Sequence, residues 1–178
     1  MSALPTARPS GFSLVELMIA IAIMATLMGL AVPSFRTWLQ NSQIRNAAES
    51  VQNGLQRARA EAVGRNANVE FVLGAGSSWV VQLPLPASAV IESRPASEGS
   101  RDVAVAVTPG GTTTVTFNNF GSVVTPNGDG SAPFTRVDLD SSVLDAADSQ
   151  NLRVTIGVGG NARMCDPNLA AGSSPRAC

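Results

Sequence analysis

An apolar run of about 22 residues, from Phe12 to Pro33, constrains this chain more than any other feature of its sequence. As a helix, the run would be about 33 Å long, close to the membrane's hydrocarbon thickness of about 30 Å. Its only polar members are Ser13, Glu16 and Thr26. Because an ionisable side chain inside a membrane span is energetically costly, it marks a functional site by default. The run therefore predicts a transmembrane helix with a functional carboxylate at Glu16.

The run differs from an ordinary secretory signal, which has a shorter apolar core followed by a small-residue cleavage site. No Ala-x-Ala site follows the run, and the change in character comes before it, at Gly11. Two interpretations remain: a plain signal anchor, and a segment that is processed at its front end. The Gly11-Phe12 junction together with Glu16 favours the second.

These residues resemble the class III signal of type IV pilins and type II secretion pseudopilins. The resemblance implies that prepilin peptidase cuts after Gly11 and that the new N-terminal Phe12 is N-methylated. It also implies that Glu16, fifth in the mature chain, pairs with the amine of a neighbouring subunit during fibre assembly. Pro33 lies where the family commonly carries a helix-bending proline.

Physical arguments add to the resemblance. Pro33 removes one helix hydrogen bond and clashes with the carbonyl of Gly29, so we expect a bend there. After cleavage, the N-terminal amine of Phe12 could pair with Glu16 of the same subunit or of a staggered neighbouring subunit. The sequence alone does not distinguish these two pairings. Ala22, Ala25 and Gly29 form a small-residue stripe at helical spacing, suited either to close helix packing or to an ordinary lipid-exposed face.

The helical pattern continues beyond the membrane segment, over Phe35–Val63. Apolar residues there recur at steps of three and four and form one face: Ile44, Ala48, Val51, Leu55, Ala58 and Ala62. Gly64 followed by Asn66 predicts a helix C-cap, and Gly54 is expected to weaken the helix by up to about 1 kcal/mol. The whole helix, Phe12–Val63, would be about 78 Å long, with an amphipathic second half that packs on a sheet.

Strand and turn signals replace the helical pattern after Asn66. Alternating apolar residues predict a first hairpin over 69–83, a second hairpin from Val103–Val107 and Thr113–Phe117, and further strands at Phe134–Leu139 and Leu152–Val158. Residues 84–102, with three prolines, read as irregular. The predicted fold class is α+β, a long N-terminal helix packed by its second half on an antiparallel β-sheet head. The predicted organisation is a leader at 1–11, a helix at 12–65 with its membrane part at 12–33, and a head at 66–178.

Three segments resemble the GspH/FimT branch of the pilin-like proteins: Leu55–Val63, Thr116–Gly121 and Leu152–Cys165. This resemblance implies a minor pilin with a β-sheet head. Its expected partners are other minor and major pilins, prepilin peptidase and the inner membrane, with the head in the periplasm before incorporation into a fibre. A minor pseudopilin of a type II secretion system is the alternative.

The composition argues against catalysis. The chain has no His and no Tyr, which excludes a Ser-His or Cys-His nucleophile pair and a His metal site. The 127–130 stretch has some calcium-loop character but lacks the full acidic spacing, so we interpret it as a turn. We therefore expect no enzyme activity, no cofactor and no metal. The net charge of −1 indicates no general polyanion partner.

Cys165 and Cys178 are the only cysteines. A membrane-anchored head in an oxidising compartment makes a disulfide between them the default expectation. By the chain-entropy account, closing a loop near this length stabilises the fold by about 3 kcal/mol.

DNA binding is a further candidate function of the tail. Some FimT-type minor pilins bind DNA and carry a Gly-Arg-x-Arg motif, to which Gly160-Asn161-Ala162-Arg163 corresponds with one Arg missing. A small basic patch could still form from Arg153, Arg163 and Arg176. Because Asp166 lies beside it and each lost phosphate contact lowers affinity, we favour a structural role over DNA binding.

Overall fold

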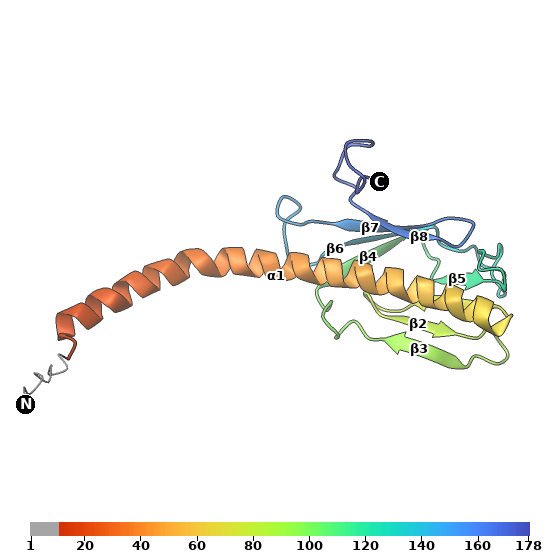
Figure 1. Ribbon diagram of the computed structural model, residues 1–178, viewed down its shortest axis with the longest axis horizontal. Helices are drawn as coiled ribbons and strands as arrows, with labels where there is room; N and C mark the ends of the chain where they lie inside the picture. The colour runs from red at the N-terminus through yellow and green to blue at the C-terminus, as the bar shows by residue number, and fades with distance from the viewer. Residues whose placement is uncertain (1–10) are drawn as a thin grey trace, which may run out of the picture. The chain divides into compact units, whose positions relative to one another are not determined.

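The computed structural model describes residues 11–178 (Figure 1). The predicted leader therefore lies outside the described residues, apart from Gly11. The chain divides into two compact units, one ending at Arg36 and one from Thr37 to Cys178. Every residue of the hydrophobic core belongs to the second unit, which we call the head.

One long helix, α1, runs from Leu14 to Arg65. It ends where Asn66 takes a left-handed conformation, with φ of 51°. The Ala67 N–H donates to the Ala62 carbonyl, and the Asn66 N–H donates to the Val63 carbonyl, each at 3.2 Å. These two bonds form a Schellman cap. Asn66, the second residue of the predicted cap, is therefore the left-handed one, and the helix ends at Arg65, the last residue of the predicted 12–65 segment.

Eight strands follow in two antiparallel sheets of four. The first sheet has the order β3-β2-β1-β5, with bounds Val90–Arg94, Trp79–Gln82, Val69–Leu73 and Thr114–Phe117. The second has the order β4-β6-β7-β8, with bounds Val103–Thr108, Arg136–Ser141, Leu152–Ile156 and Ala162–Cys165. The predicted fold class and the predicted β1–β2 hairpin are confirmed.

The predicted second hairpin is wrong. Strand β4 pairs with β6, whereas β5 pairs with β1 in the other sheet. The turn residues between β4 and β5 were recognised correctly, but they carry the chain from one sheet to the other. Strand β5 is buried at all four positions, and its place beside β1 in the core provides that burial. The turn residues between β4 and β5 carry no information about this burial.

Two strands were not separately predicted. Strand β3 lies inside the stretch expected to be irregular, because Glu92 and Arg94 give this half-exposed edge strand little apolar signal. Strand β8 follows β7 closely in the segment that resembles the GspH/FimT branch, and the two strands pair in register.

The helix and both sheets share one core. The head part of α1 buries Ile44, Ala47, Ala48, Val51, Gly54, Leu55, Ala58 and Ala62. Across from Gly54, the rings of Phe71 and Trp79 lie with their centroids 5.7 Å apart. A Cβ atom at Gly54 would lie 2.6 Å from Phe71 Cε2 and 2.9 Å from Trp79 Cε2. Gly54 thus lies where the helix packs closely against these two rings, so a residue that is a weak helix former is needed there for packing.

Candidate functional site

The predicted processing junction is open to an external enzyme. Gly11, Phe12 and Ser13 precede the helix, and Phe12 is 84% exposed. Among the described residues, a Cβ atom at Gly11 would meet no heavy atom within 4 Å. No contact with a described residue therefore requires glycine at this position.

Glu16 lies in the first turn of α1. Its N–H donates to the hydroxyl of Ser13 at 3.2 Å, and the Leu17 N–H donates to the Ser13 carbonyl at 3.1 Å, so Ser13 is the N-cap. The pattern Ser-x-x-Glu, from Ser13 to Glu16, is that of a capping box and is the sequence signal for this helix start. A carboxylate in the first turn is also stabilised by the positive end of the helix dipole.

The membrane-length part of α1 is exposed and has no packing partner among the described residues. One 18-residue window of this helix has a mean hydropathy of 2.3, and none of that window is buried. Large apolar side chains along it are exposed: Leu14, Val15, Leu17, Met18, Ile19, Ile21, Ile23, Met24, Leu27, Met28, Leu30 and Val32. The segment is one that a membrane or other subunits must cover.

Pro33 lies inside α1, which continues through it as one helix (Figure 1). Hydroxyls on either side bond back to carbonyls of the preceding turn: Thr26 to Ala22 at 2.8 Å, and Ser34 to Ala31 at 3.0 Å. Such back-bonding often accompanies a bent helix. The bend near Gly29 and Pro33 stays a prediction.

The C-terminal tail is closed by a disulfide between Cys165 and Cys178, whose Cα atoms are 5.1 Å apart. The tail also pairs with the chain just after β8, because the Asp166 N–H donates to the Arg176 carbonyl at 2.7 Å. Arg163 adds a third tether, with Nη2 donating to the Pro175 carbonyl at 2.8 Å and the Ala177 carbonyl at 3.0 Å.

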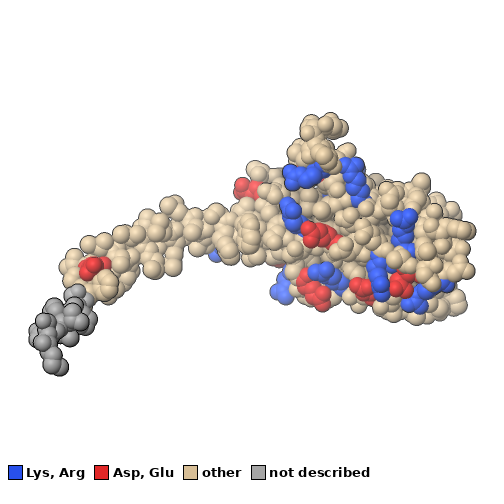
Figure 2. Space-filling model, viewed as in Figure 1, with Lys and Arg blue, Asp and Glu red and all other residues tan. Residues whose placement is uncertain are grey.

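The three arginines proposed for a basic patch have different surroundings. Arg153 Nε lies 2.6 Å from Asp138, whose other oxygen is 2.9 Å from Arg136. Arg163 is engaged by the tail carbonyls. Neither Arg163 nor Arg176 makes an ion pair with a described residue. Figure 2 shows basic and acidic side chains interspersed over the visible face of the head.

The matching Gly in the Gly160–Arg163 motif also has a structural duty. Gly160 has a φ of 77°, and a Cβ atom there would lie 1.9 Å from the carbonyl oxygen of Gly121. The same carbonyl accepts a hydrogen bond from Arg59 Nε at 3.0 Å. Arg59 thereby ties the helix to the loop before Gly121, a role that the sequence pattern did not reveal because the contact spans the fold. Asn161, where the motif has its first Arg, is exposed.

The 127–130 stretch is a turn, as predicted, and its buried Asn127 caps the edge of β5. Asn127 Oδ1 accepts from the Thr116 N–H at 3.0 Å, and its Nδ2 donates to the Thr114 carbonyl at 3.1 Å. Hydrogen bonds from the Ser131 hydroxyl and N–H lower the pKa of Asp129. Among the described residues, no group of three or more His, Cys, Asp or Glu side chains could hold a metal ion.

A family model described as Type II transport protein GspH matches residues 47–160, which is most of the head. The chain belongs to the GspH family. A second model, the prokaryotic N-terminal methylation motif, matches residues 7–32 of this GspH-family protein. This match includes Gly11, Phe12 and Glu16 and runs through the exposed apolar part of α1.

Two crystal structures of the Pseudomonas aeruginosa (strain PAO1) type IV minor pilin FimU share the fold. The P21 form superposes with a TM-score of 0.54 at 17% identity, covering 73% of this chain and 93% of FimU. The P65 form gives a TM-score of 0.52 at 16% identity, covering 72% and 98%. This GspH-family protein is thus a structural protein of the minor pilin and pseudopilin class rather than an enzyme. Its methylation motif and apolar helix fit a pilin that is anchored in the inner membrane and incorporated into a pilus or pseudopilus.

Proposed function

We propose that this protein is a structural minor pilin that prepilin peptidase cuts after Gly11, and that it enters a type IV pilus and helps to initiate assembly at the tip. One observation carries the proposal. The described part of the chain has a long apolar helix that it leaves exposed, and the glycine before this helix makes no close contact with a described residue. Gly54 and Gly160, by contrast, are needed for close contacts inside the head.

Intact-mass analysis of the membrane-extracted protein tests the processing step. The mature chain should begin at Phe12, with the added mass of one methyl group, and Gly11→Val should block cutting. Gly110→Val is a matched control, because Gly110 also has no heavy atom within 4 Å of its Cβ position and no positive φ. A wild-type chain that still starts at Met1, or that begins beyond Val32, would contradict the proposal.

A substitution at Glu16 separates its two roles. Glu16→Gln keeps a side chain that the capping box accepts but removes the charge, so the helix start and membrane insertion should be retained. If the carboxylate pairs with a neighbouring subunit's amine, the variant should be depleted from sheared fibres while its level in the membrane stays normal. Glu49→Gln, a solvent-exposed change on the same helix, serves as the control. Unchanged incorporation of Glu16→Gln would rule out the assembly role of the charge.

A pseudopilin of a type II secretion system is the second candidate, favoured by the description of the matching family model. Both candidates share the N-terminal processing and the exposed helix, so the head must be tested in its cellular setting. Deletion of the gene should reduce surface pili if the pilus assignment is correct, and should block export of folded proteins if the secretion assignment is correct. Co-purification of the head with candidate minor pilins would identify its neighbours at the tip.

A further inference from the structure

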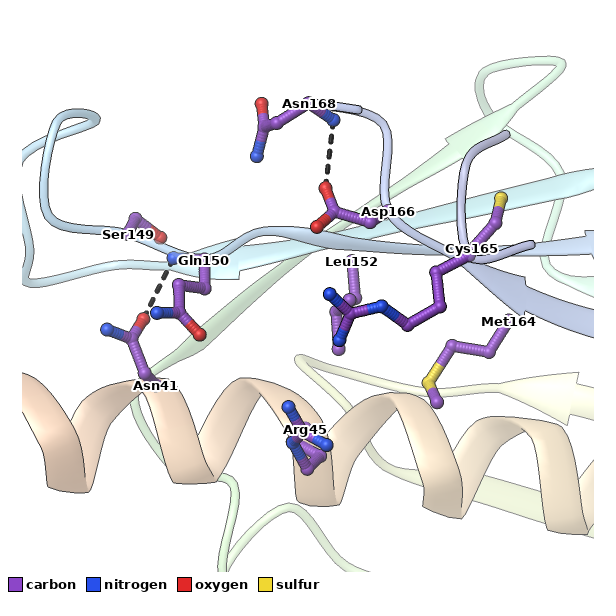
Figure 3. A pocket seen from close by; sticks show the side chains of 10 residues that line it. Asn41, Arg45, Ser149, Gln150, Leu152, Met164, Cys165, Asp166 and Asn168 are labelled. Carbon is purple, nitrogen blue, oxygen red and sulfur yellow. Dashed lines mark hydrogen bonds between the residues drawn. The ribbon is translucent and has the colours of Figure 1, made fainter. Parts of the chain in front are cut away.

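A cavity of about 380 Å³ lies in the head beside the closed tail, a size typical of ligand sites. Figure 3 shows Arg45 on the helix side and Leu152 and Met164 on the strand side. The loop before β7 forms a further wall, held to the helix because the Gln150 N–H donates to Asn41 Oδ1 at 2.8 Å. The site is therefore built from elements that are already fixed to one another.

Two guanidinium groups line this cavity without a carboxylate partner. Arg45 and Arg176 make no ion pair with any described residue. The one acidic side chain in the lining, Asp166, has an oxygen bonded to the Asn168 N–H at 2.9 Å. The cavity thus has an excess of positive charge that a ligand carboxylate can neutralise with charge-assisted hydrogen bonds.

The edge of β8 offers backbone groups at the same place. Residues in an antiparallel strand alternately direct both backbone groups toward and away from the neighbouring strand. Ala162 directs its carbonyl outward, where Gln52 donates to it at 3.4 Å. Met164, two residues further on, therefore also directs its N–H and C=O outward, and the described chain supplies no partner for them. At the next outward position, the Asp166 N–H is already bonded to the tail.

From these two features together, we propose that the cavity binds a short acidic peptide segment of another subunit. A peptide can satisfy both features at once, with its backbone paired to Met164 and a carboxylate between Arg45 and Arg176. The aliphatic part of an acidic side chain would contact Leu152. A DNA phosphate could accept from the Met164 N–H and contact the arginines, but it has no donor for the Met164 carbonyl.

The inference rests on the proposed assembly role for the source of the peptide, but not for the binding itself. Binding is therefore measured on the purified full-length protein in detergent micelles, by fluorescence polarisation of labelled tetraglutamate and tetraglutamine. Processing at Gly11 and incorporation through Glu16 are measured separately, so a failure of peptide binding does not count against them.

Wild-type protein should bind tetraglutamate at least about tenfold more tightly than tetraglutamine. The double variant Arg45→Gln/Arg176→Gln should lose at least about tenfold in affinity for tetraglutamate. Arg101→Gln is the control, because Arg101 also lacks an ion pair with a described residue but lies outside this cavity. The affinity of this variant for tetraglutamate should differ from that of the wild type by less than about twofold. Equal binding of the two peptides, or equal binding by the double variant, would overturn the proposal.

The backbone half of the site has its own test. Met164→Pro removes the outward N–H, which an edge strand tolerates, whereas Met164→Leu keeps it. Tetraglutamate binding should be weakened by Pro and retained by Leu, and equal binding by the two variants would count against the backbone contact. A labelled 20-base-pair duplex that binds through the same two arginines, more tightly than tetraglutamate, would assign the site to nucleic acid instead.

Discussion

Replacing Gly54 by Ala should destabilise the head, although alanine is the better helix former. Helix propensity favours Ala by about 1 kcal/mol. Against this, the new Cβ would lie 2.6 Å from a carbon of Phe71 and 2.9 Å from one of Trp79. Both rings are buried, and the Trp79 N–H is bonded to the Ser50 hydroxyl at 2.8 Å, so neither ring can easily move.

Overpacking of a well-packed core costs about 1–3 kcal/mol, and the fixed rings place this site near the upper end. The net loss for Gly54→Ala is then about 2 kcal/mol, which lowers the melting temperature by about 6 °C for a domain of this size. The measurement is thermal unfolding, followed by circular dichroism, of the soluble head fragment from Thr37 to Cys178, which contains the whole core.

Gly64→Ala is the matched control, since Gly64 lies in the same helix with no heavy atom within 4 Å of its Cβ position. Gly64→Ala should raise the free energy of unfolding by up to about 1 kcal/mol, and with it the melting temperature slightly. A second variant, Gly54→Ala/Phe71→Leu, should be more stable than the sum of its single changes predicts, because the smaller side chain relieves the clash. If Gly54→Ala raises the melting temperature as Gly64→Ala does, the close-approach argument is refuted.

Three further predictions concern the head fragment. Reducing the disulfide should lower its stability by about 3 kcal/mol, and a melting temperature that does not change on reduction would contradict the tethering role of the tail. Hydrogen bonding from Arg65 lowers the pKa of Glu61 below its ordinary value of 4.5. The ionised Glu61 therefore stabilises the fold above that pH, and this stabilisation is lost as the pH falls through the lowered pKa. Glu61→Gln should make the melting temperature depend less on pH in this acid range. Duplex DNA should bind the wild-type head weakly at most, and more weakly still as salt rises. Asn161→Arg should strengthen DNA binding, whereas Arg163→Ala should chiefly loosen the tail. Tight wild-type binding at physiological salt would place DNA binding above the structural role.

The membrane-length segment and the N-terminal methylation motif could be predicted from the sequence because their signals are local. Hydropathy over Phe12–Pro33 is a property of consecutive residues, and so is the polar-to-apolar change at Gly11. The amphipathic face of the second half of α1 is also local, since helical periodicity places its apolar residues on one side. The same reasoning identified β1 and β2 as a hairpin, because the two strands pair directly across a short turn.

Only the tertiary structure decided which strands pair and what several single residues do. Strands β4 and β5 are neighbours in sequence but lie in different sheets, because burial beside β1 outweighs the turn between them. The sequence predicts only that Gly54 weakens the helix, and its role in close packing becomes evident when Phe71 is placed opposite it. Arg163 holds tail carbonyls that lie more than ten residues further along the chain. Such long-range contacts depend on the shape of the whole core, which no local pattern in the sequence encodes.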